Sequence, residues 1–333
     1  MRIKTYLFSK TGGLNLSLLE KFHTLIILLA VILGLILGHV PIIGGHANHF
    51  IIPFLFLMLF GLFLSIPIKD LKAAFLNSKF AATSLSINFL WTPVLAWGLG
   101  AVFLSDHPAL WIGFIMLMVT PCTDWYLVFT DIAKGNVPLA ASILPINLIL
   151  QVLLLPVYLL LFAGVMETVK LSVLLESILI VLALPFLLAN FTRFLLTKTN
   201  KQKFLEEKLI AFFSTGQIIF LSLAIMAMFA SQGRYLFENA NVVYVLLIPV
   251  LLFFVVNFIF ARIVSLLLKF SFEDSGSLNL TTLARNSPVS LAIAVTVFPD
   301  QPLIALALVI GPLIELPVLT IVSQLLLRIK MKR

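Results

Sequence analysis

Two short polar stretches interrupt apolar segments of the chain, and their side chains are of types that bind solutes. The first is Thr120-Pro121-Cys122-Thr123-Asp124, within the apolar run 110–129. The second is Arg285-Asn286-Ser287-Pro288, within the run 278–298. A Cys thiolate is a soft ligand for a thiophilic metalloid, whereas a guanidinium binds carboxylates and other oxyanions. A metalloid and a small organic anion are therefore both candidate substrates.

The two stretches occupy equivalent positions of a repeated pattern. Pro121 and Pro288 are 167 residues apart (288 − 121), and Pro145 and Pro312 have the same separation (312 − 145). Interrupted membrane helices at matching places in two halves indicate the binding site of a secondary transporter. The simpler alternative is a pair of proline kinks in structural helices.

Each break predicts a pair of half-helices. Proline costs little in the first turn of a helix, and Thr120 and Ser287, which precede the prolines, are good N-cap residues. We expect the second half-helices to begin at Pro121 and Pro288. Their N-termini favour anions or neutral oxygen-rich solutes. The carbonyls that end the first half-helices can hold a cation or polar groups, because irregular backbone at this depth must face protein or a wet cavity.

The composition places these breaks in a polytopic, all-α membrane protein. Hydrophobic residues make up 61% of the chain and charged residues 11%, whereas a soluble domain carries about 25% charged residues. A helix needs about 20 apolar residues to cross a bilayer. Ten segments qualify: 22–40, 50–67, 80–103, 109–133, 137–163, 172–195, 205–230, 241–268, 275–298 and 302–328.

Lys and Arg residues predict how these spans are oriented. With the N-terminus in the cytoplasm, the inner segments carry 19 of the 22 Lys and Arg residues, and the outer segments carry only Lys170 and Arg234. Such an excess marks cytoplasmic loops. We therefore predict a plasma-membrane protein with both termini in the cytoplasm. Because five spans is an odd number, the second half (164–333) should be an inverted repeat of the first (1–163).

Several classes of function are not supported by any motif. The single cysteine excludes an internal disulfide and a metal cage built from cysteines. The sequence contains no H-E-x-x-H, G-x-S-x-G or ATP-binding motif. We expect no enzymatic activity, no cofactor and no nucleic-acid partner. The expected partners are a small-molecule or metalloid substrate, a coupling ion and the lipid bilayer.

Three ionisable side chains lie deep within predicted spans: Asp124, Arg285 and Glu315. Charges at that depth are costly and commonly mark substrate or proton sites. Asp124 and Arg285 are expected to contact each other across the two breaks, as a structural ion pair or as part of the transport site. Asp124 and Glu315 are the candidates for carrying a coupling proton.

The predicted substrate site comprises both breaks and neighbouring polar residues. Asn88, Gln151 and Asn257 are further candidates for lining the cavity, or alternatively for hydrogen bonds between helices. Cys122 is either a transient ligand of trivalent arsenic or antimony or a small apolar filler. The substrate-binding set is Cys122, Thr123, Asp124, Asn147, Arg285, Asn286, Ser287, Ser290 and Glu315.

The chain resembles the arsenite-permease family of the bile acid:sodium symporter superfamily. The resemblance rests on Pro121-Cys122-Thr123, on the run 291–295 (Leu-Ala-Ile-Ala-Val) and on the run 311–318 (Gly-Pro-Leu-Ile-Glu-Leu-Pro-Val). It implies a core of the third to fifth and eighth to tenth spans, in which the fourth and ninth cross, and a panel of the other four. It also implies arsenite or antimonite efflux, with Cys122 at the position of the family's essential thiol.

This sequence departs from the family pattern at several positions. Ser290 stands where arsenite permeases carry a glutamate, and Asp124 and Trp125 follow the Cys-Thr pair. Thr281 and Arg285 stand near the acidic and amide residues of sodium-coupled members. A guanidinium there repels sodium. We therefore predict arsenite or antimonite export by proton exchange and alternating access. The alternatives are a sodium- or proton-coupled importer of a small organic anion and a passive channel or receptor-like protein.

Overall fold

The computed structural model describes residues 23–65, 77–123, 125–163, 176, 179–238 and 241–331. The secondary structure of these residues is helical, apart from one isolated antiparallel β-bridge between Pro121 and Arg285. The prediction of an all-α chain is therefore confirmed for the part of the chain that is described.

The helices follow one another from α3 to α18, and the π-helical segments are named η. Residues 78–103 form one continuous helix from α6, η3 and α7, and residues 202–238 form another from α13, η6 and α14. The bounds are α3 (His23–Gly38), α4 (Pro41–Ser65), α6 (Ser78–Ser86), η3 (Ile87–Trp91), α7 (Thr92–Phe103), α8 (Pro108–Met118), α9 (Trp125–Ile132), α10 (Val137–Ala163), η5 (Leu179–Ala183), α12 (Leu184–Lys198), α13 (Gln202–Phe204), η6 (Leu205–Ile210), α14 (Ala211–Glu238), α15 (Asn241–Leu267), α16 (Phe272–Leu283), α17 (Ser287–Val297) and α18 (Pro302–Met331).

Seven helices in the described part of the chain are long and apolar enough to cross a membrane. They are Pro41–Ser65, Ser78–Phe103, Val137–Phe162, Val181–Lys198, Gln202–Gln232, Tyr244–Leu267 and Pro302–Met331. Three shorter apolar helices are Leu25–Gly38, Pro108–Met118 and Ser287–Val297. The protein is therefore an integral membrane protein. The count of ten spans stays a prediction.

Capping residues, prolines and residues with positive φ angles mark the ends of several helices near the two breaks. Ser271 caps α16 by accepting a hydrogen bond from the Asp274 N–H, and Glu273 and Asp274 bring negative charge to its first turn. These features stabilise a helix N-terminus. α7 and α8 each have a proline in the first turn, and Lys134 and Lys269 adopt positive φ angles just after α9 and α15, as is common where helices end.

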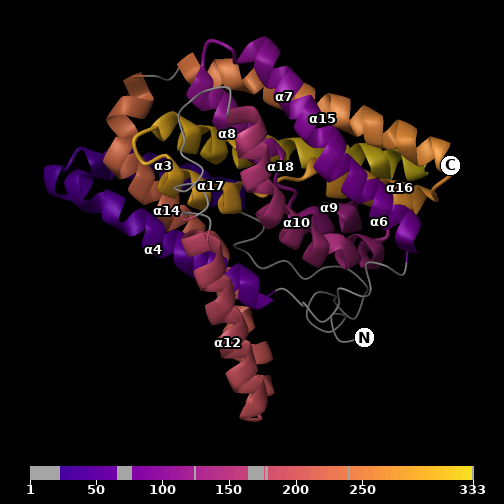
Figure 1. The fold of residues 1–333 in the computed structure, drawn as a ribbon, viewed down its shortest axis with the longest axis horizontal. Helices are drawn as coiled ribbons and strands as arrows, with labels where there is room; N and C mark the ends of the chain where they lie inside the picture. The colour runs from indigo at the N-terminus through magenta and orange to yellow at the C-terminus, as the bar shows by residue number, and fades with distance from the viewer. Residues whose placement is uncertain are drawn as a thin grey trace.

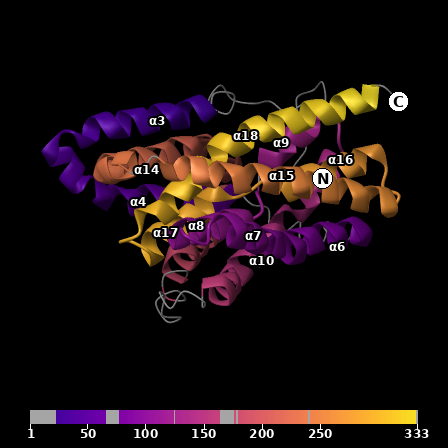
Figure 2. The same ribbon diagram turned by 90° about the horizontal axis from the view of Figure 1, so that it is seen from above.

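The helices pack in two neighbouring groups. In Figures 1 and 2, α3, α4 and α14 lie together on one side of the molecule, whereas α6, α9, α10, α15 and α16 lie on the other, with α8, α17 and α18 between them. α14 packs along both α3 and α4, α8 packs against α18, and α16 packs against α15. Each break therefore joins a central helix, α8 or α17, to a helix of the second group, α9 or α16.

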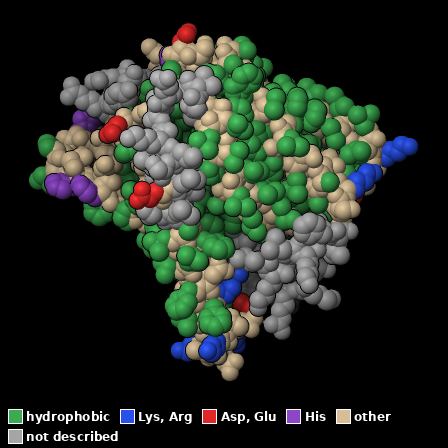
Figure 3. Space-filling view, viewed as in Figure 1, with side chains coloured by type: hydrophobic (Ala, Val, Ile, Leu, Met, Phe, Trp, Pro, Cys, Tyr) green, Lys and Arg blue, Asp and Glu red, His purple; other side chains and the backbone are tan. Residues whose placement is uncertain are grey.

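The visible surface is what a lipid-embedded helical protein requires. Figure 3 shows hydrophobic side chains over most of this face, with Lys and Arg side chains gathered at the far end of α12 and near the end of α18. Many large apolar side chains on α3, α12 and α15 are more than 40% exposed, including Ile36, Phe191 and Ile259. Exposed apolar side chains of this number are favourable in contact with lipid rather than water.

A cluster of polar contacts joins the end of α18 to the start of α16. Lys330 forms a 2.7 Å ion pair with Glu273 and donates a hydrogen bond to the Lys134 carbonyl. The hydrogen bond from Lys330 lowers the pKa of Glu273. Asn136, between α9 and α10, donates a 2.8 Å hydrogen bond to Asp274. These contacts hold together the end of α9, the starts of α10 and α16 and the end of α18.

Gly113 allows α8 to approach α18 closely, and replacing it is expected to loosen this contact. A Cβ atom at Gly113 would lie 2.7 Å from the Ala307 Cβ and 2.8 Å from the Ile304 carbonyl oxygen. We expect Gly113→Ala to lower the free energy of unfolding by about 1–3 kcal/mol, the usual cost of overpacking. The midpoint of thermal unfolding in detergent measures this effect.

Gly98→Ala is the matched control, because a Cβ at Gly98 would have no atom within 4 Å. Alanine is the better helix former by up to about 1 kcal/mol, so this variant should keep or raise the unfolding temperature. Equal unfolding temperatures for the two variants would contradict the close packing of α8 on α18.

Candidate substrate site at the helix crossing

The two polar breaks lie against each other and pair through their backbones. α8 ends at Met118 and α9 begins at Trp125, whereas α16 ends at Leu283 and α17 begins at Ser287. The Cys122 N–H donates to the Ala284 carbonyl (2.9 Å), and the Asn286 N–H donates to the Thr120 carbonyl (2.7 Å). These bonds replace helical hydrogen bonds that are lost at both breaks, as buried backbone in a membrane requires.

The helix caps differ from those predicted. Asn286, not Ser287, is the N-cap of α17, because its side chain accepts the Val289 N–H and Pro288 lies in the first turn. The predicted caps fail because each hydroxyl has a nearer carbonyl: Ser287 Oγ donates to the Leu308 carbonyl of α18. Thr120 Oγ1 likewise donates to the Met116 and Leu117 carbonyls at the end of α8. α9 begins four residues after the predicted Pro121.

Arg285 is buried where the two breaks pair, a place that we call the crossing, and it donates hydrogen bonds to the C-terminal ends of α8 and α16. Its guanidinium donates to the Met118 carbonyl of α8 (2.9 Å), to the Leu283 carbonyl of α16 (3.0 Å) and to the Thr282 carbonyl. It also lies 5.0 Å from the centre of the Phe253 ring on α15. A cation is stabilised at helix C-termini by the dipole and by the free carbonyls.

Glu315 is the acidic group that the structure brings to Arg285. Its carboxylate accepts a 2.8 Å hydrogen bond from the Arg285 backbone N–H and interacts electrostatically with the guanidinium. Glu315 is 4% exposed, on α18. Asp124 lies outside the described residues, so its contact with Arg285 stays a prediction.

Cys122 lies within the paired segment and is almost fully buried, with 2% of its surface exposed. Its thiol interacts electrostatically with the Arg285 guanidinium. Thr123 is also buried, and its hydroxyl accepts a 3.4 Å hydrogen bond from the Asn286 amide. The thiol, the guanidinium and two polar side chains therefore meet where the two breaks pair.

Ser290 contacts the opposite break rather than its own helix. Its hydroxyl donates to the Met116 carbonyl and lies 2.8 Å from the Thr120 hydroxyl. Since Ser290 is fully buried on α17, these contacts join α17 to the end of α8. Thr120 is thus a further polar group of the crossing.

The amide side chains predicted to line a cavity are all fully buried: Asn88, Asn147, Gln151 and Asn257. Asn257 on α15 donates to the Thr282 carbonyl, which also accepts from Arg285. The structure thus connects Asn257 to the crossing. Asn147, the one amide of α10 in the predicted substrate site, has no hydrogen bond that joins it to the crossing among the described residues; Gln151 lies one turn further along α10 and Asn88 lies on η3.

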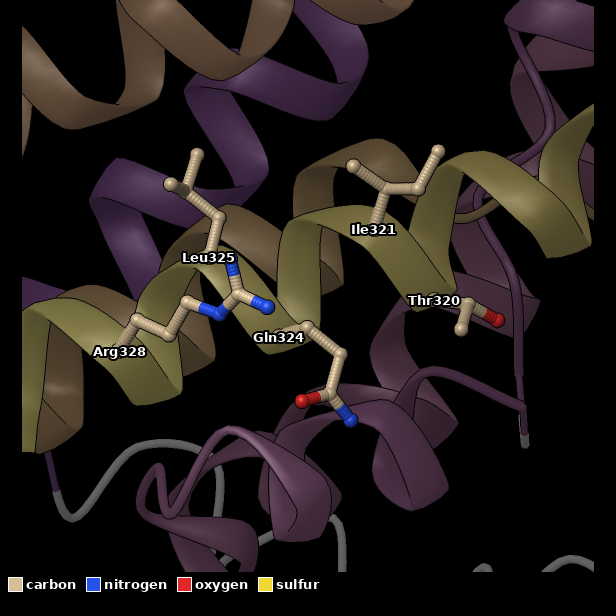
Figure 4. A pocket seen from close by; sticks show the side chains of 5 residues that line it. All are labelled: Thr320, Ile321, Gln324, Leu325 and Arg328. Atoms are coloured by element: carbon tan, nitrogen blue, oxygen red, sulfur yellow. The ribbon is translucent and has the colours of Figure 1, made fainter.

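A cavity lined by residues of α18 is not part of the predicted site. It has a volume of about 320 Å³ and is lined by Thr320, Ile321, Gln324, Leu325 and Arg328, as Figure 4 shows. At 100° per residue, Gln324 is on the opposite face of α18 from Glu315. No predicted site residue lines this cavity.

The crossing brings together one thiol, several hydroxyls and main-chain polar groups. Among the described residues, no three His, Cys, Asp or Glu side chains come together to hold a metal ion. Phe253 and the carbonyls of Met118 and Thr282 were not predicted as partners of Arg285. The aromatic residues of the segment 241–268 carry no pattern that singles out Phe253, and every residue has a carbonyl.

The sequence is similar to a family model and to several known proteins. The Sodium Bile acid symporter family matches residues 52–239. The arsenical-resistance protein Acr3 of Corynebacterium glutamicum is 27% identical over 92% of this chain and 88% of its own length. An uncharacterized transporter of Synechocystis is 27% identical over 95% of this chain and 90% of its own. An uncharacterized protein of Bacillus subtilis is 24% identical over 91% and 96%.

The family match covers more than half of the chain, and the relatives extend the similarity across both breaks. The resemblance to this superfamily, predicted from three short motifs, is therefore confirmed. The chain belongs to the sodium bile acid symporter family and is a membrane transporter of that family.

Proposed function

We propose that the protein exports arsenite or antimonite in exchange for protons, by alternating access. The observation that carries the proposal is the position of Cys122, whose thiol is buried at the backbone pairing of the two breaks and interacts with Arg285. The similarity to an arsenical-resistance protein over most of both chains supports the same substrate.

The chemistry of trivalent arsenic suits a site with one thiol. Arsenite at neutral pH is an uncharged trihydroxide, and a thiol replaces one hydroxide while a water molecule leaves. One As–S bond is reversible, as transport requires, and Thr123 and Asn286 offer hydrogen bonds to the remaining hydroxyls. An electropositive surrounding favours the reactive thiolate, and Arg285 provides it.

Protons are the proposed coupling ion because the expected cation position is already occupied. Unwound helix ends commonly coordinate a coupling cation through their carbonyls. Here the Arg285 guanidinium donates to three such carbonyls. A neutral substrate cannot be expelled by the membrane potential, so a titrating carboxylate must couple export to proton entry. Glu315, which touches Arg285, and Asp124 are the proposed proton carriers.

The proposed architecture is ten spans in two inverted five-span repeats, residues 1–163 and 164–333. The fourth and ninth spans would be the broken helices that cross. Both termini would lie on the cytoplasmic side of the plasma membrane. The supporting observation is the antiparallel bridge between two breaks that are equivalent in the repeat.

Uptake into everted membrane vesicles tests the proposed function. We expect arsenite and antimonite to accumulate when a pH gradient is imposed, and sodium to have no effect. A panel of small organic anions should not accumulate. Sodium-driven movement of an organic anion in the opposite direction would instead support the importer. A passive channel would show no counterflow in proteoliposomes.

A further inference from the structure

Among the interior side chains that have no hydrogen-bond partner within the described residues, five uncharged ones lie on two helices. Ser84, Asn88 and Thr92 lie on the continuous helix 78–103, and Asn147 and Gln151 lie on α10. All five are fully buried, with 0% of their surface exposed. We call this set the polar seam.

The middle of the first row, at Asn88, lies on a segment that packs against the helix of the second row. Within each row the residues are four positions apart and so share a helix face. The segment η3, which contains Asn88, packs against α10. Tyr158 of α10 donates a 2.7 Å hydrogen bond to the Phe89 carbonyl of η3. Ile143 of α10 lies in the same buried cluster as Ile87.

The unpaired atoms define the kind of ligand that would satisfy them. Both the N–H₂ donors and the oxygen acceptors of Asn88, Asn147 and Gln151 are unpaired, as are the hydroxyls of Ser84 and Thr92. A cation would satisfy only the oxygens, and an anion only the donors. A hydroxyl group both donates and accepts. Since the seam contains no charged residue, its ligand should also be uncharged.

The seam is closed in this conformation, because fully buried side chains leave no room for a water molecule beside them. Unpaired buried polar groups are costly, so a conformation that lets a ligand in is favoured by the hydrogen bonds it gains. The π-helical segment η3 lies at the centre of the seam. Such segments are frequent at functional sites.

We propose that the polar seam opens as the protein changes conformation, with or without substrate, and binds a neutral hydroxyl-bearing molecule. The molecule is either water or the undissociated acid of the transported metalloid, and the second source rests on the proposed function. The seam lies on helices that flank the crossing, since α10 packs against both α8 and α16.

Cysteine labelling tests whether the seam opens. Cys122 is the single cysteine, so the full-length Cys122→Ser protein has no thiol, and Ser84→Cys or Gln151→Cys adds one. We expect 2-aminoethyl methanethiosulfonate, a small water-borne thiol reagent, to modify both thiols at least about tenfold faster than that of the control Leu148→Cys, a difference of about 1.4 kcal/mol. Leu148 is 4% exposed and adjacent to Asn147 on another face of α10.

Labelling of both seam thiols as slow as that of Leu148→Cys would overturn the proposal. Ser84→Cys exchanges only oxygen for sulfur, so it keeps the test valid if Gln151→Cys does not fold. The labelling does not depend on the substrate. Absence of arsenite transport by the wild type would therefore count against the proposed function and not against the seam.

Transport assays on variants that keep Cys122 distinguish water from the metalloid acid as the molecule that binds the seam. Asn147→Leu and Gln151→Met keep the side-chain volume but remove the hydrogen-bonding groups. If the metalloid acid binds the seam, both should raise the half-saturating arsenite concentration about tenfold, while Leu148→Met leaves it unchanged. If only water binds, the labelling stays fast and this concentration does not change.

Discussion

Arg285→Ala is expected to abolish export and to destabilise the protein, and added guanidinium is expected to restore part of both. Removing the side chain leaves three carbonyls at the half-helix ends and the nearby Glu315 carboxylate without their cation. Loss of one partner of a buried charge pair costs about 3–5 kcal/mol. Arsenite uptake into everted vesicles and the unfolding midpoint measure the two effects.

Rescue of Arg285→Ala by added small molecules shows whether the charge or the planar shape of the lost side chain matters. Guanidinium at millimolar concentration should raise the unfolding midpoint of Arg285→Ala, whereas urea, which is planar but neutral, should not. Arg193→Ala is the matched control, because Arg193 also donates to helix-end carbonyls, those of Phe63 and Leu64 at the end of α4. It should lose stability without losing export. Normal export by Arg285→Ala would show that the guanidinium is not required.

Cys122→Ser is expected to abolish arsenite and antimonite resistance in an arsenite-sensitive host while the protein is still made and inserted. A serine hydroxyl fits the same space but is not a soft ligand, so the reversible As–S bond is lost. The measurement is growth on graded arsenite, together with the amount of protein in the membrane.

Ser323→Ala serves as the control for removal of a small buried polar atom on another helix. Ser323 is fully buried on α18, and its hydroxyl donates a hydrogen bond to the Thr320 carbonyl. This variant should keep full resistance. If Cys122→Ser also kept full resistance, Cys122 would be a small core residue with no part in transport.

The positions of the two breaks could be predicted because their cause is local. Proline lacks an N–H, and Asp, Asn and Arg side chains are costly in an apolar helix, so the polar stretches at 120–124 and 285–288 mark where regular helix stops. The caps were predicted wrongly because a hydroxyl can bond to any nearby carbonyl. Which carbonyl is nearest to Thr120 or Ser287 depends on α8 and α18, and so on tertiary structure.

The partners of Arg285 could not be predicted for the same reason. The sequence suggests a carboxylate partner, yet three of its hydrogen bonds go to main-chain carbonyls. The second span was predicted to begin near residue 50, but the helix α4 begins at Pro41. Gly44, His46 and His49 lower the hydropathy there, but backbone hydrogen bonds continue the helix beyond the apolar part.

The bridge between Pro121 and Arg285 has an evolutionary consequence. Its two hydrogen bonds join main-chain atoms of Cys122 and Ala284 and of Asn286 and Thr120. Because these bonds use no side-chain atoms, exchange of the side chains at 122 and 123 leaves both bonds possible, whereas exchange at 290 also removes the Ser290 contacts with α8. We therefore expect that single substitutions here can change specificity while the main-chain pairing is kept. Directed evolution at these three positions is the natural place to seek them.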